Sequence, residues 1–251
     1  MFGEVADVYD RVRPSYPTEL IDRVVERAAL RSGDAVLESG AGTGKATALL
    51  AARELRVTAV EPDAAMAAQL RARELPGVSI VASDFESCTV DDGSFALVAA
   101  AQSWHWVDPD RGAQRAAEVL RPNGWIALWW NSADWGDTTI RRAIGAAYEV
   151  HAPDLLGTHM LAGRQMRVEE MADEQLLASH QFVDTRRDTF RWTQRYERDD
   201  YLALASTSSD HRLIEAARLD ALLGAVGAAI DAEGGAFDLP YSVDLVMARR
   251  P

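Results

Sequence analysis

The sequence has one cysteine, Cys88, and one lysine, Lys45, among its 26 basic residues. A single cysteine excludes a disulfide within the chain and also excludes a cysteine-rich metal site. The five histidines are scattered, and no two of them have the spacing of a zinc-binding His-x-x-x-His motif. We therefore expect no metal site.

A basic stripe and a long apolar run are also absent. The chain has 39 acidic residues and a net charge of −13, whereas nucleic-acid binding needs clustered basic residues that displace counterions from phosphates. No stretch approaches the roughly 20 apolar residues of a membrane span, and Met1–Val5 lacks the basic start of a signal peptide. The sequence predicts a cytoplasmic protein without nucleic-acid or membrane partners, either a monomer or a homodimer.

Strand-type and helix-type segments alternate through the first half of the chain. A helix is predicted within 15–30, before the first strand. Apolar or β-branched runs then lie at 35–37, 57–60, 78–81, 95–101 and 125–130, and helical patterns separate most of them, at 46–55, 64–75 and 112–120. Strands separated by helices of this length form βαβ units with a parallel sheet. We therefore predict a doubly wound α/β fold, in a chain whose length suits one domain.

The alternation stops after the fifth predicted strand. Residues 135–183 look helical and irregular, and we interpret them as a helical cap inserted after that strand. Two more strands are predicted at 190–196 and 241–248, with a long helix at 213–230 between them. The chain is then one domain, 1–251, with four parts: an N-terminal entrance or lid segment (1–30), a cofactor-binding core (31–134), the cap (135–183) and the last strands with their helices (184–251).

A glycine-rich loop follows the first predicted strand and opens a helix. It reads Glu38-Ser39-Gly40-Ala41-Gly42-Thr43-Gly44-Lys45. A phosphate-binding P-loop needs four residues before Gly-Lys and then Ser or Thr, but three residues separate Gly40 from Gly44, and Ala46 follows Lys45. A dinucleotide fingerprint needs G-x-G-x-x-G, and neither register supplies its third glycine. The tighter G-x-G-x-G spacing suits a nucleoside with an amino-acid tail.

Acidic residues follow the next two predicted strands. Glu61 ends the second strand, and an acid at this point of a doubly wound fold accepts hydrogen bonds from ribose hydroxyls. Asp84 and Phe85 follow the third strand, where the carboxylate suits an exocyclic adenine amine and the ring suits an adenine face. Because ligands of open α/β sheets lie at the carboxyl ends of the strands, we expect these groups and the glycine loop to share one site.

These motifs together resemble those of the class I S-adenosylmethionine-dependent methyltransferases. The likeness is clear over residues 9–130 and rests on strand pattern alone in the C-terminal part. It implies S-adenosylmethionine as cofactor, S-adenosylhomocysteine as its product, and a Rossmann-like seven-stranded sheet, mostly parallel with an antiparallel last strand. The cofactor-binding residues that follow from the resemblance are Tyr16, Glu38, Gly40, Ala41, Gly42, Thr43, Gly44, Glu61, Pro62, Met66, Asp84, Phe85, Gln102 and Trp104.

Two further segments indicate a subgroup within this family. Tyr9–Pro17 is similar to the entrance segment of the small-molecule group near the trans-aconitate methyltransferases, and Gln102–Trp106 is similar to that group's segment after strand four. The resemblance implies a small-molecule acceptor, and carboxylate O-methylation is the first hypothesis for the reaction.

Methyl transfer is an in-line displacement at a sulfonium carbon, so the protein mainly supplies orientation and exclusion of water. His105 is the candidate base, which a phenol, alcohol or amine acceptor needs and a carboxylate does not. In an extended strand His105 would face away from Trp104 and Trp106. Three more tryptophans lie at or just beyond strands four and five: Trp129, Trp130 and Trp135. Core packing accounts for some of the five, particularly one of the Trp129–Trp130 pair, and the remainder are candidates for an aromatic wall beside the sulfonium.

Several alternatives remain open at this point. Four arginines of the predicted cap either hold an anionic acceptor or are solvated surface residues: Arg141, Arg142, Arg164 and Arg167. A cofactor-binding regulator without catalysis would carry the same motifs. An NAD(P)-dependent oxidoreductase is disfavoured by the glycine spacing.

Overall fold

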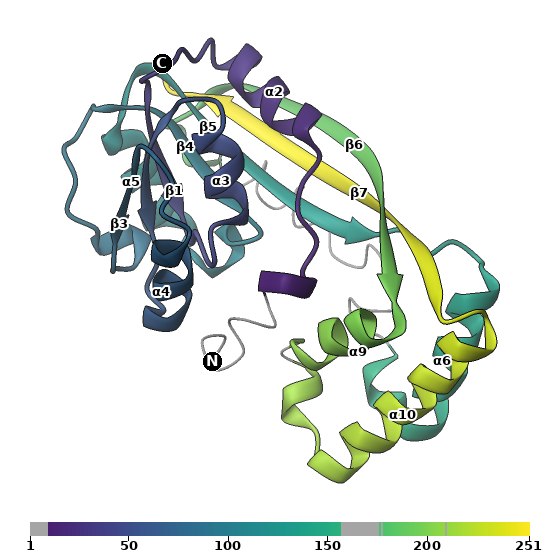
Figure 1. Ribbon diagram of the computed structural model, residues 1–251. Helices are drawn as coiled ribbons and strands as arrows, with labels where there is room; N and C mark the ends of the chain where they lie inside the picture. The colour runs from purple at the N-terminus through teal and green to yellow at the C-terminus, as the bar shows by residue number, and fades with distance from the viewer. Residues whose placement is uncertain (1–9, 157–175, 177, 209) are drawn as a thin grey trace.

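The computed structural model describes residues 10–156, 176, 178–208 and 210–251 (Figure 1). Within them one seven-stranded sheet has the order β3-β2-β1-β4-β5-β7-β6. Its strands are β1 (Ala35–Ser39), β2 (Arg56–Val60), β3 (Val78–Val81), β4 (Phe95–Ala101), β5 (Leu120–Ala133), β6 (Val183–Glu197) and β7 (Ala236–Arg249).

The pairing within this sheet confirms the predicted fold class. β1 to β5 pair in parallel, and β7 runs antiparallel to both of its neighbours, β5 and β6. Strand order reverses at β1, which lies between β2 and β4. The carboxyl ends of the parallel strands therefore meet at one edge, and the reversal is the place where doubly wound folds bind ligands.

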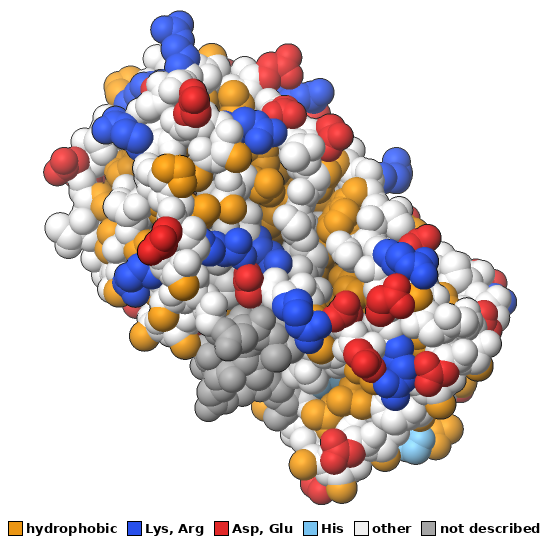
Figure 2. Space-filling view, in the orientation of Figure 1, with side chains coloured by type: hydrophobic (Ala, Val, Ile, Leu, Met, Phe, Trp, Pro, Cys, Tyr) orange, Lys and Arg blue, Asp and Glu red, His pale blue; other side chains and the backbone are white. Residues whose placement is uncertain are grey.

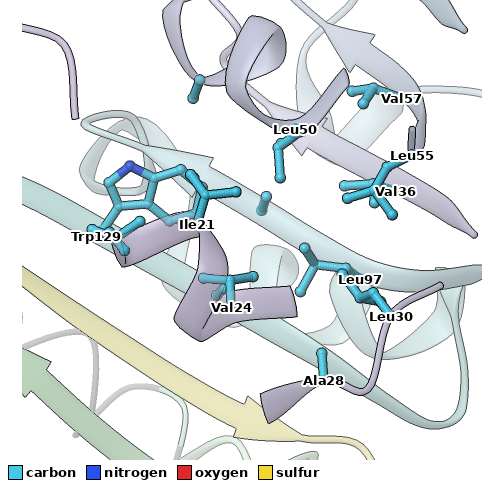
Figure 3. Packing of buried hydrophobic residues seen from close by; sticks show 14 of the residues in the cluster. Ile21, Val24, Ala28, Leu30, Val36, Leu50, Leu55, Val57, Leu97 and Trp129 are labelled. Carbon is cyan, nitrogen blue, oxygen red and sulfur yellow. The ribbon is translucent and has the colours of Figure 1, made fainter. Parts of the chain in front are cut away.

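Helices cover both faces of the sheet because successive strand residues point to opposite sides. On one face Val36 packs with α2 (Thr18–Arg27), α3 (Lys45–Ala51) and α4 (Ala64–Ala72). Figure 3 shows this core, with Ile21 and Val24 of α2 close to Trp129 of β5. On the other face Leu37 belongs to the core that contains the apolar side of α5 (Pro109–Val119).

A second lobe of helices lies beyond the carboxyl edge of the sheet (Figure 1). It contains α6 (Thr139–His151), the short turns η4 (Pro153–Leu155) and η5 (His211–Leu213), α9 (Arg198–Ser206) and α10 (Ala216–Ala232). The long strands β5, β6 and β7 connect it to the core, and it has an apolar cluster of its own. We call it the helical lobe.

The composition of this lobe differs from the predicted cap. Of the elements that the structure describes in this lobe, α6 and η4 come from residues 135–183, whereas α9, η5 and α10 come from the chain between β6 and β7. The lobe is therefore not an insertion after β5 alone. Val183, which we placed at the end of the cap, is the first residue of β6. Arg164 and Arg167 lie outside the described residues, as do residues 1–9 of the predicted entrance segment.

The last two strands are longer than their sequence pattern indicates. β6 begins at Val183 rather than at residue 190. It is an edge strand whose residues before Phe190 are largely exposed and mostly polar, so this part lacks the apolar pattern by which a strand is predicted. β7 begins at Ala236 rather than 241 and includes Pro240. None of the helices that the structure describes is long and apolar enough to cross a membrane.

Candidate cofactor and acceptor site

The glycine loop connects β1 to α3 and combines tight internal packing with one open position. Gly40 has a φ of +64° and Gly42 a φ of +58°, a region that side chains rarely adopt. A Cβ on Gly40 would lie 2.5 Å from Cβ of Ser103, whereas a Cβ on Gly42 would meet no atom within 4 Å. Gly40 therefore allows the loop to pack on the end of β4, and Gly42 leaves its backbone accessible to a ligand.

Glu61, directly after β2, fixes the backbone of Gly42. The backbone N–H of Gly42 donates to Glu61 Oε2 at 2.7 Å, and that of Asp63 donates to Oε1 at 2.9 Å. Burial raises the pKa of Glu61, and the two backbone bonds oppose that effect. Each carboxylate oxygen has a second lone pair, so the same group can still accept a ligand hydroxyl.

Glu38 lies beneath the loop and is 1% exposed. The hydroxyl of Thr47 donates to its Oε2 at 2.6 Å. Burial raises the pKa of Glu38 to about 8, and the nearby Glu61 carboxylate adds to the rise. Glu38 is therefore protonated at neutral pH. Sequence reasoning did not identify Thr47, which faces Glu38 because it lies one turn into α3.

The end of β4 makes a strained turn into the site. Gln102 has a φ of +57°, which costs about 1–3 kcal/mol in a residue with a side chain. Its side-chain amide donates to the carbonyl of Asn131 at 3.2 Å, and the hydroxyl of Ser103 donates to the carbonyl of Ser39 at 2.6 Å. The ends of β1, β4 and β5 are thus tied together, through two residues, Ser103 and Asn131, that were not among the predicted site residues.

The residues after Gln102 do not continue as a strand. Trp104–Trp106 form a short 3₁₀ turn, η3, because the chain reverses direction after the strained residue. Trp104 is buried and packs edge-on against Phe85, with ring centroids 5.6 Å apart. Phe85 is 3% exposed, so its ring belongs to the core beneath the end of β3. The neighbouring Asp84 is exposed and makes no side-chain hydrogen bond to the described residues.

The remaining predicted cofactor residues surround the loop. Ala41, Thr43 and Gly44 are buried parts of the loop itself, and Gly44 precedes the first turn of α3. Pro62 is exposed after Glu61. Met66 is buried in α4, and its N–H is capped by Asp63 at 3.0 Å. Tyr16, half-buried, packs edge-on against Trp129 at 5.9 Å.

His105 lies at the surface of η3 and accepts a hydrogen bond. The indole Nε1 of Trp130 donates to its Nδ1 at 3.4 Å. A neutral His105 ring in this arrangement has its proton on Nε2, so the outward nitrogen is a donor rather than a base.

The proposed aromatic wall is wrong as a single surface. Trp129 belongs to one core of the sheet, Trp104 and Trp130 to the other, and Trp135 to the helical lobe, while Trp106 is 71% exposed. The buried indole N–H of Trp129 has no acceptor among the described residues. Figure 3 shows this nitrogen turned away from Val24 and Ala28.

The N-terminal segment, residues 10–16, crosses from the glycine loop to the helical lobe. The Asp10 carboxylate accepts from the Thr43 hydroxyl at 2.6 Å and from the Arg73 guanidinium at 2.5 Å. Burial alone would raise the pKa of Asp10, but these two bonds hold it below its ordinary value. The single lysine, Lys45, is half-buried and donates to the Asp10 carbonyl at 2.5 Å, so it helps to hold the N-terminal segment on the loop.

The other end of the segment contacts the helical lobe and the strands. Val12 is buried in the core of that lobe, and Arg11 forms an ion pair with Asp200 of α9. Asn131 of β5 donates to the carbonyl of Ser15 at 2.9 Å. Figure 2 shows a hollow between the core and the long strands that is lined by hydrophobic side chains, with acidic and basic side chains together at one end.

Comparison with known proteins agrees with this geometry. Residues 37–128 match the methyltransferase domain family. Over this range the chain is similar to methyltransferase domains. The matched range contains the glycine loop, Glu61, Asp84 and η3. No group of three or more His, Cys, Asp or Glu side chains suited to a metal is present among the described residues.

Individual relatives point the same way. An uncharacterized methyltransferase of Mycobacterium tuberculosis, Rv3342, is 46% identical over 133 residues. That alignment covers 53% of this chain and 53% of the relative, so the chain spans about half the length of the curated relatives it matches.

Solved structures share the fold over nearly the whole chain. A putative type II methyltransferase from Anaeromyxobacter dehalogenans has a TM-score of 0.68 at 22% identity, covering 94% of this chain and 97% of that one. A phosphoethanolamine N-methyltransferase of Haemonchus contortus, in complex with phosphomonomethylethanolamine and S-adenosylhomocysteine, has a TM-score of 0.55 at 14% identity, covering 99% of this chain and 57% of that one.

Proposed function

We propose that this chain transfers the methyl group of S-adenosylmethionine to a small-molecule acceptor, and that the acceptor atom is a carboxylate oxygen. The observation that carries the proposal is the open position at Gly42, held by Glu61 at the reversal of strand order. A nucleoside placed there meets backbone N–H groups from the loop and a carboxylate for its ribose hydroxyls.

The other strand ends suit the remaining parts of the cofactor. The exposed Asp84 carboxylate accepts from the adenine amine, while the buried rings of Phe85 and Trp104 support that side from below. Gln102 and Tyr16 flank the amino-acid tail beside the glycine loop, and Glu38 lies beneath it. Thr43 is engaged by Asp10, so its role is to fix the N-terminal segment across the site.

S-adenosylmethionine supplies an activated methyl group, so the residues of this chain mainly bind, orient and exclude water. A carboxylate acceptor is already a nucleophile at neutral pH and needs no base. This agrees with the arrangement of His105, whose Nδ1 is engaged by Trp130 and whose Nε2 is a donor when the ring is neutral. In this proposal His105 orients the acceptor through that donor.

A single-turnover assay with radiolabelled S-adenosylmethionine tests the proposal. Enzyme in excess over the labelled cofactor is mixed with a panel of carboxylates, phenols and amines, and labelled products are separated. We expect label on at least one carboxylate, as a base-labile methyl ester. Label on amines or phenols alone would contradict the proposal that the acceptor atom is a carboxylate oxygen. Tight cofactor binding without label on any compound would indicate a binding protein without catalysis.

A further inference from the structure

Four tyrosine hydroxyls gather inside the helical lobe, away from the strand ends described above. They belong to Tyr148 of α6, Tyr196 of β6, Tyr201 of α9 and Tyr241 of β7, and His211 of η5 lies among them. We call these five residues the tyrosine cluster. None of them is more than 6% exposed. Five separate segments of the chain thus deliver polar groups to one buried place.

Hydrogen bonds connect part of this cluster. The hydroxyl of Tyr148 and Nε2 of His211 lie 2.6 Å apart, and the hydroxyls of Tyr196 and Tyr241 lie 3.0 Å apart. Burial raises the pKa of Tyr201 well above its ordinary value, and the neighbouring Tyr148 and Tyr196 add to the rise. The ring of Tyr201 packs edge-on against that of Tyr196, with ring centroids 5.9 Å apart.

The hydroxyl of Tyr201 nevertheless has no hydrogen-bond partner among the residues that the structure describes. The hydroxyl of Ser208, two residues beyond α9, is also buried without one. A buried polar group without a partner loses its bond to water with nothing to offset the loss, so such groups are rare in proteins. Phenylalanine would pack the same ring without this cost.

A positive charge lies beside the cluster. The guanidinium of Arg13, on the N-terminal segment, donates to the carbonyl of Thr207 at 3.3 Å. Val12, its neighbour in sequence, is buried in the same apolar cluster as Tyr196 and Tyr241. The charge of Arg13 opposes the rise that burial causes in the pKa of these two tyrosines. The acidic Asp200 faces the same region and forms an ion pair with Arg11. The half-buried Arg13 thus forms the side of the cluster that faces the core.

A chain of contacts links the cluster to the end of β4. Tyr241 stacks on Trp192, with ring centroids 5.3 Å apart. The indole of Trp192 donates to the side-chain carbonyl of Asn131 at 3.1 Å, and the backbone carbonyl of Asn131 accepts from Gln102. Gln102 is where the proposed methyl group would point, so an acceptor near it extends along Trp192 toward Tyr241.

We propose that Arg13 and the hydroxyls of Tyr201, Tyr196 and Tyr241 form the subsite for a carboxylate of the acceptor. The inference rests on the proposed methyl transfer. Phenol hydroxyls donate to carboxylate oxygens in short, charge-assisted bonds, and a guanidinium adds the matching charge. The ligand oxygen supplies the partner that Tyr201 lacks, and the aromatic surroundings of Trp192 exclude water from these bonds.

The test uses the full chain saturated with S-adenosylhomocysteine and measures melting temperature with added succinate, citrate, benzoate, inorganic phosphate or neutral succinamide. We expect at least one carboxylate to stabilise the complex, whereas succinamide does not. In Tyr201→Phe the carboxylate binds about tenfold or more weakly, as removal of a bond to a charged group predicts. The variant without added carboxylate should melt at the wild-type temperature or higher, because it loses only an unsatisfied hydroxyl.

Controls separate this inference from a structural role and from the proposed function. Arg13→Gln should abolish the carboxylate shift, and Arg11→Gln, an exposed charge on the same segment, should keep it. Wild-type carboxylate affinity in Tyr201→Phe would overturn the proposal, as would a shift with phosphate alone. If S-adenosylhomocysteine itself fails to bind, the proposed function fails first. If it binds and only amines are methylated, the proposed acceptor atom fails, whereas the carboxylate subsite is still decided by the melting temperatures of wild type and Tyr201→Phe.

Discussion

Two buried carboxyl groups at the glycine loop, Glu38 and Glu61, have different hydrogen-bond partners. Glu61 accepts from two backbone N–H groups, whereas the described partner of Glu38 is the hydroxyl of Thr47. Burial accordingly raises the pKa of Glu38 to about 8. The sequence presents both as acids at strand ends, and nothing in it reveals that one is protonated at neutral pH, because burial depends on how α3 covers the strand.

The pH dependence of folding should reveal the proton on Glu38. Its pKa is about 8 in the folded protein, against an ordinary value of 4.5 that applies to the unfolded chain, so between these values the folded state holds the proton while the unfolded state loses it. This residue's contribution to the free energy of unfolding then falls as pH rises from about 4.5 to 8, by up to about 1.4 kcal/mol per pH unit. In Glu38→Gln that decline is absent.

Urea denaturation of the cofactor-free protein at pH 6 and pH 9 measures the effect. Relative to wild type, Glu38→Gln should gain about 2–3 kcal/mol of stability between these two pH values. Parallel pH dependence in the two proteins would mean that Glu38 is ionised in the fold.

Replacing His105 tests whether the acceptor needs a base. Since its Nδ1 accepts from Trp130, we expect His105→Ala to reduce kcat/KM for a carboxylate by about tenfold or less, the size of one hydrogen bond, with no change in the shape of the pH profile. Initial rates measured from pH 5.5 to 9 give both kcat/KM and the shape of the pH profile. A base would contribute about 10²–10⁴-fold, and its loss would remove an inflection from the profile.

The N-terminal segment, residues 10–16, shows no regular helix or strand pattern in sequence, but it connects the glycine loop to the helical lobe. Asp10 binds the glycine loop through Thr43 and Arg73, and Val12 is buried in the helical lobe. The motif resemblance indicated that this segment lies at the entrance, but its partners are far apart in sequence. Such long-range ion pairs have no periodic pattern that a sequence could display.

Asp10→Ala should loosen this segment from the glycine loop. We expect weaker binding of S-adenosylhomocysteine, by a few-fold to tenfold, and faster amide hydrogen exchange across residues 40–45. The substitution removes the half-buried carboxylate that accepts from Thr43 of the loop and from Arg73, which itself donates to the Thr43 carbonyl. Asp22→Ala removes an exposed ion pair with Arg53 and is the matched control. Equal exchange in both variants would contradict a role for Asp10 at the loop.

The strands illustrate which elements a sequence reveals. β1, β2 and β4 are short and mostly buried, so their apolar runs locate them well. β3 is a partly exposed edge strand that still has a short apolar run. β6 is mostly half-exposed, and only its last part, from Phe190, has the expected pattern. The short helix α9 was not predicted, although Asp199 and Asp200 in its first turn are a helix-start signal.

At the scale of the whole molecule, a sheet domain carries the cofactor motifs and a helical lobe carries the buried tyrosine cluster. The first was predicted because each motif is contiguous in sequence and its position at a strand end is enough to locate it. The second was not, because Tyr148, Tyr196, Tyr201 and Tyr241 come from four elements and look like ordinary aromatic residues one at a time. The proposed acceptor subsite can therefore be recognised only in the folded structure.

The central claim is that the open glycine loop binds S-adenosylmethionine. Isothermal titration of S-adenosylhomocysteine and of NAD into wild type and Gly42→Val tests it most directly. We expect one S-adenosylhomocysteine site per wild-type chain, no NAD binding, and loss of binding in a folded Gly42→Val. The added side chain fills the space that is open in the structure, and the φ of +58° at this position strains it, so the fold of the variant is checked by circular dichroism. Binding of NAD instead, or S-adenosylhomocysteine affinity unchanged in a folded Gly42→Val, would contradict the account.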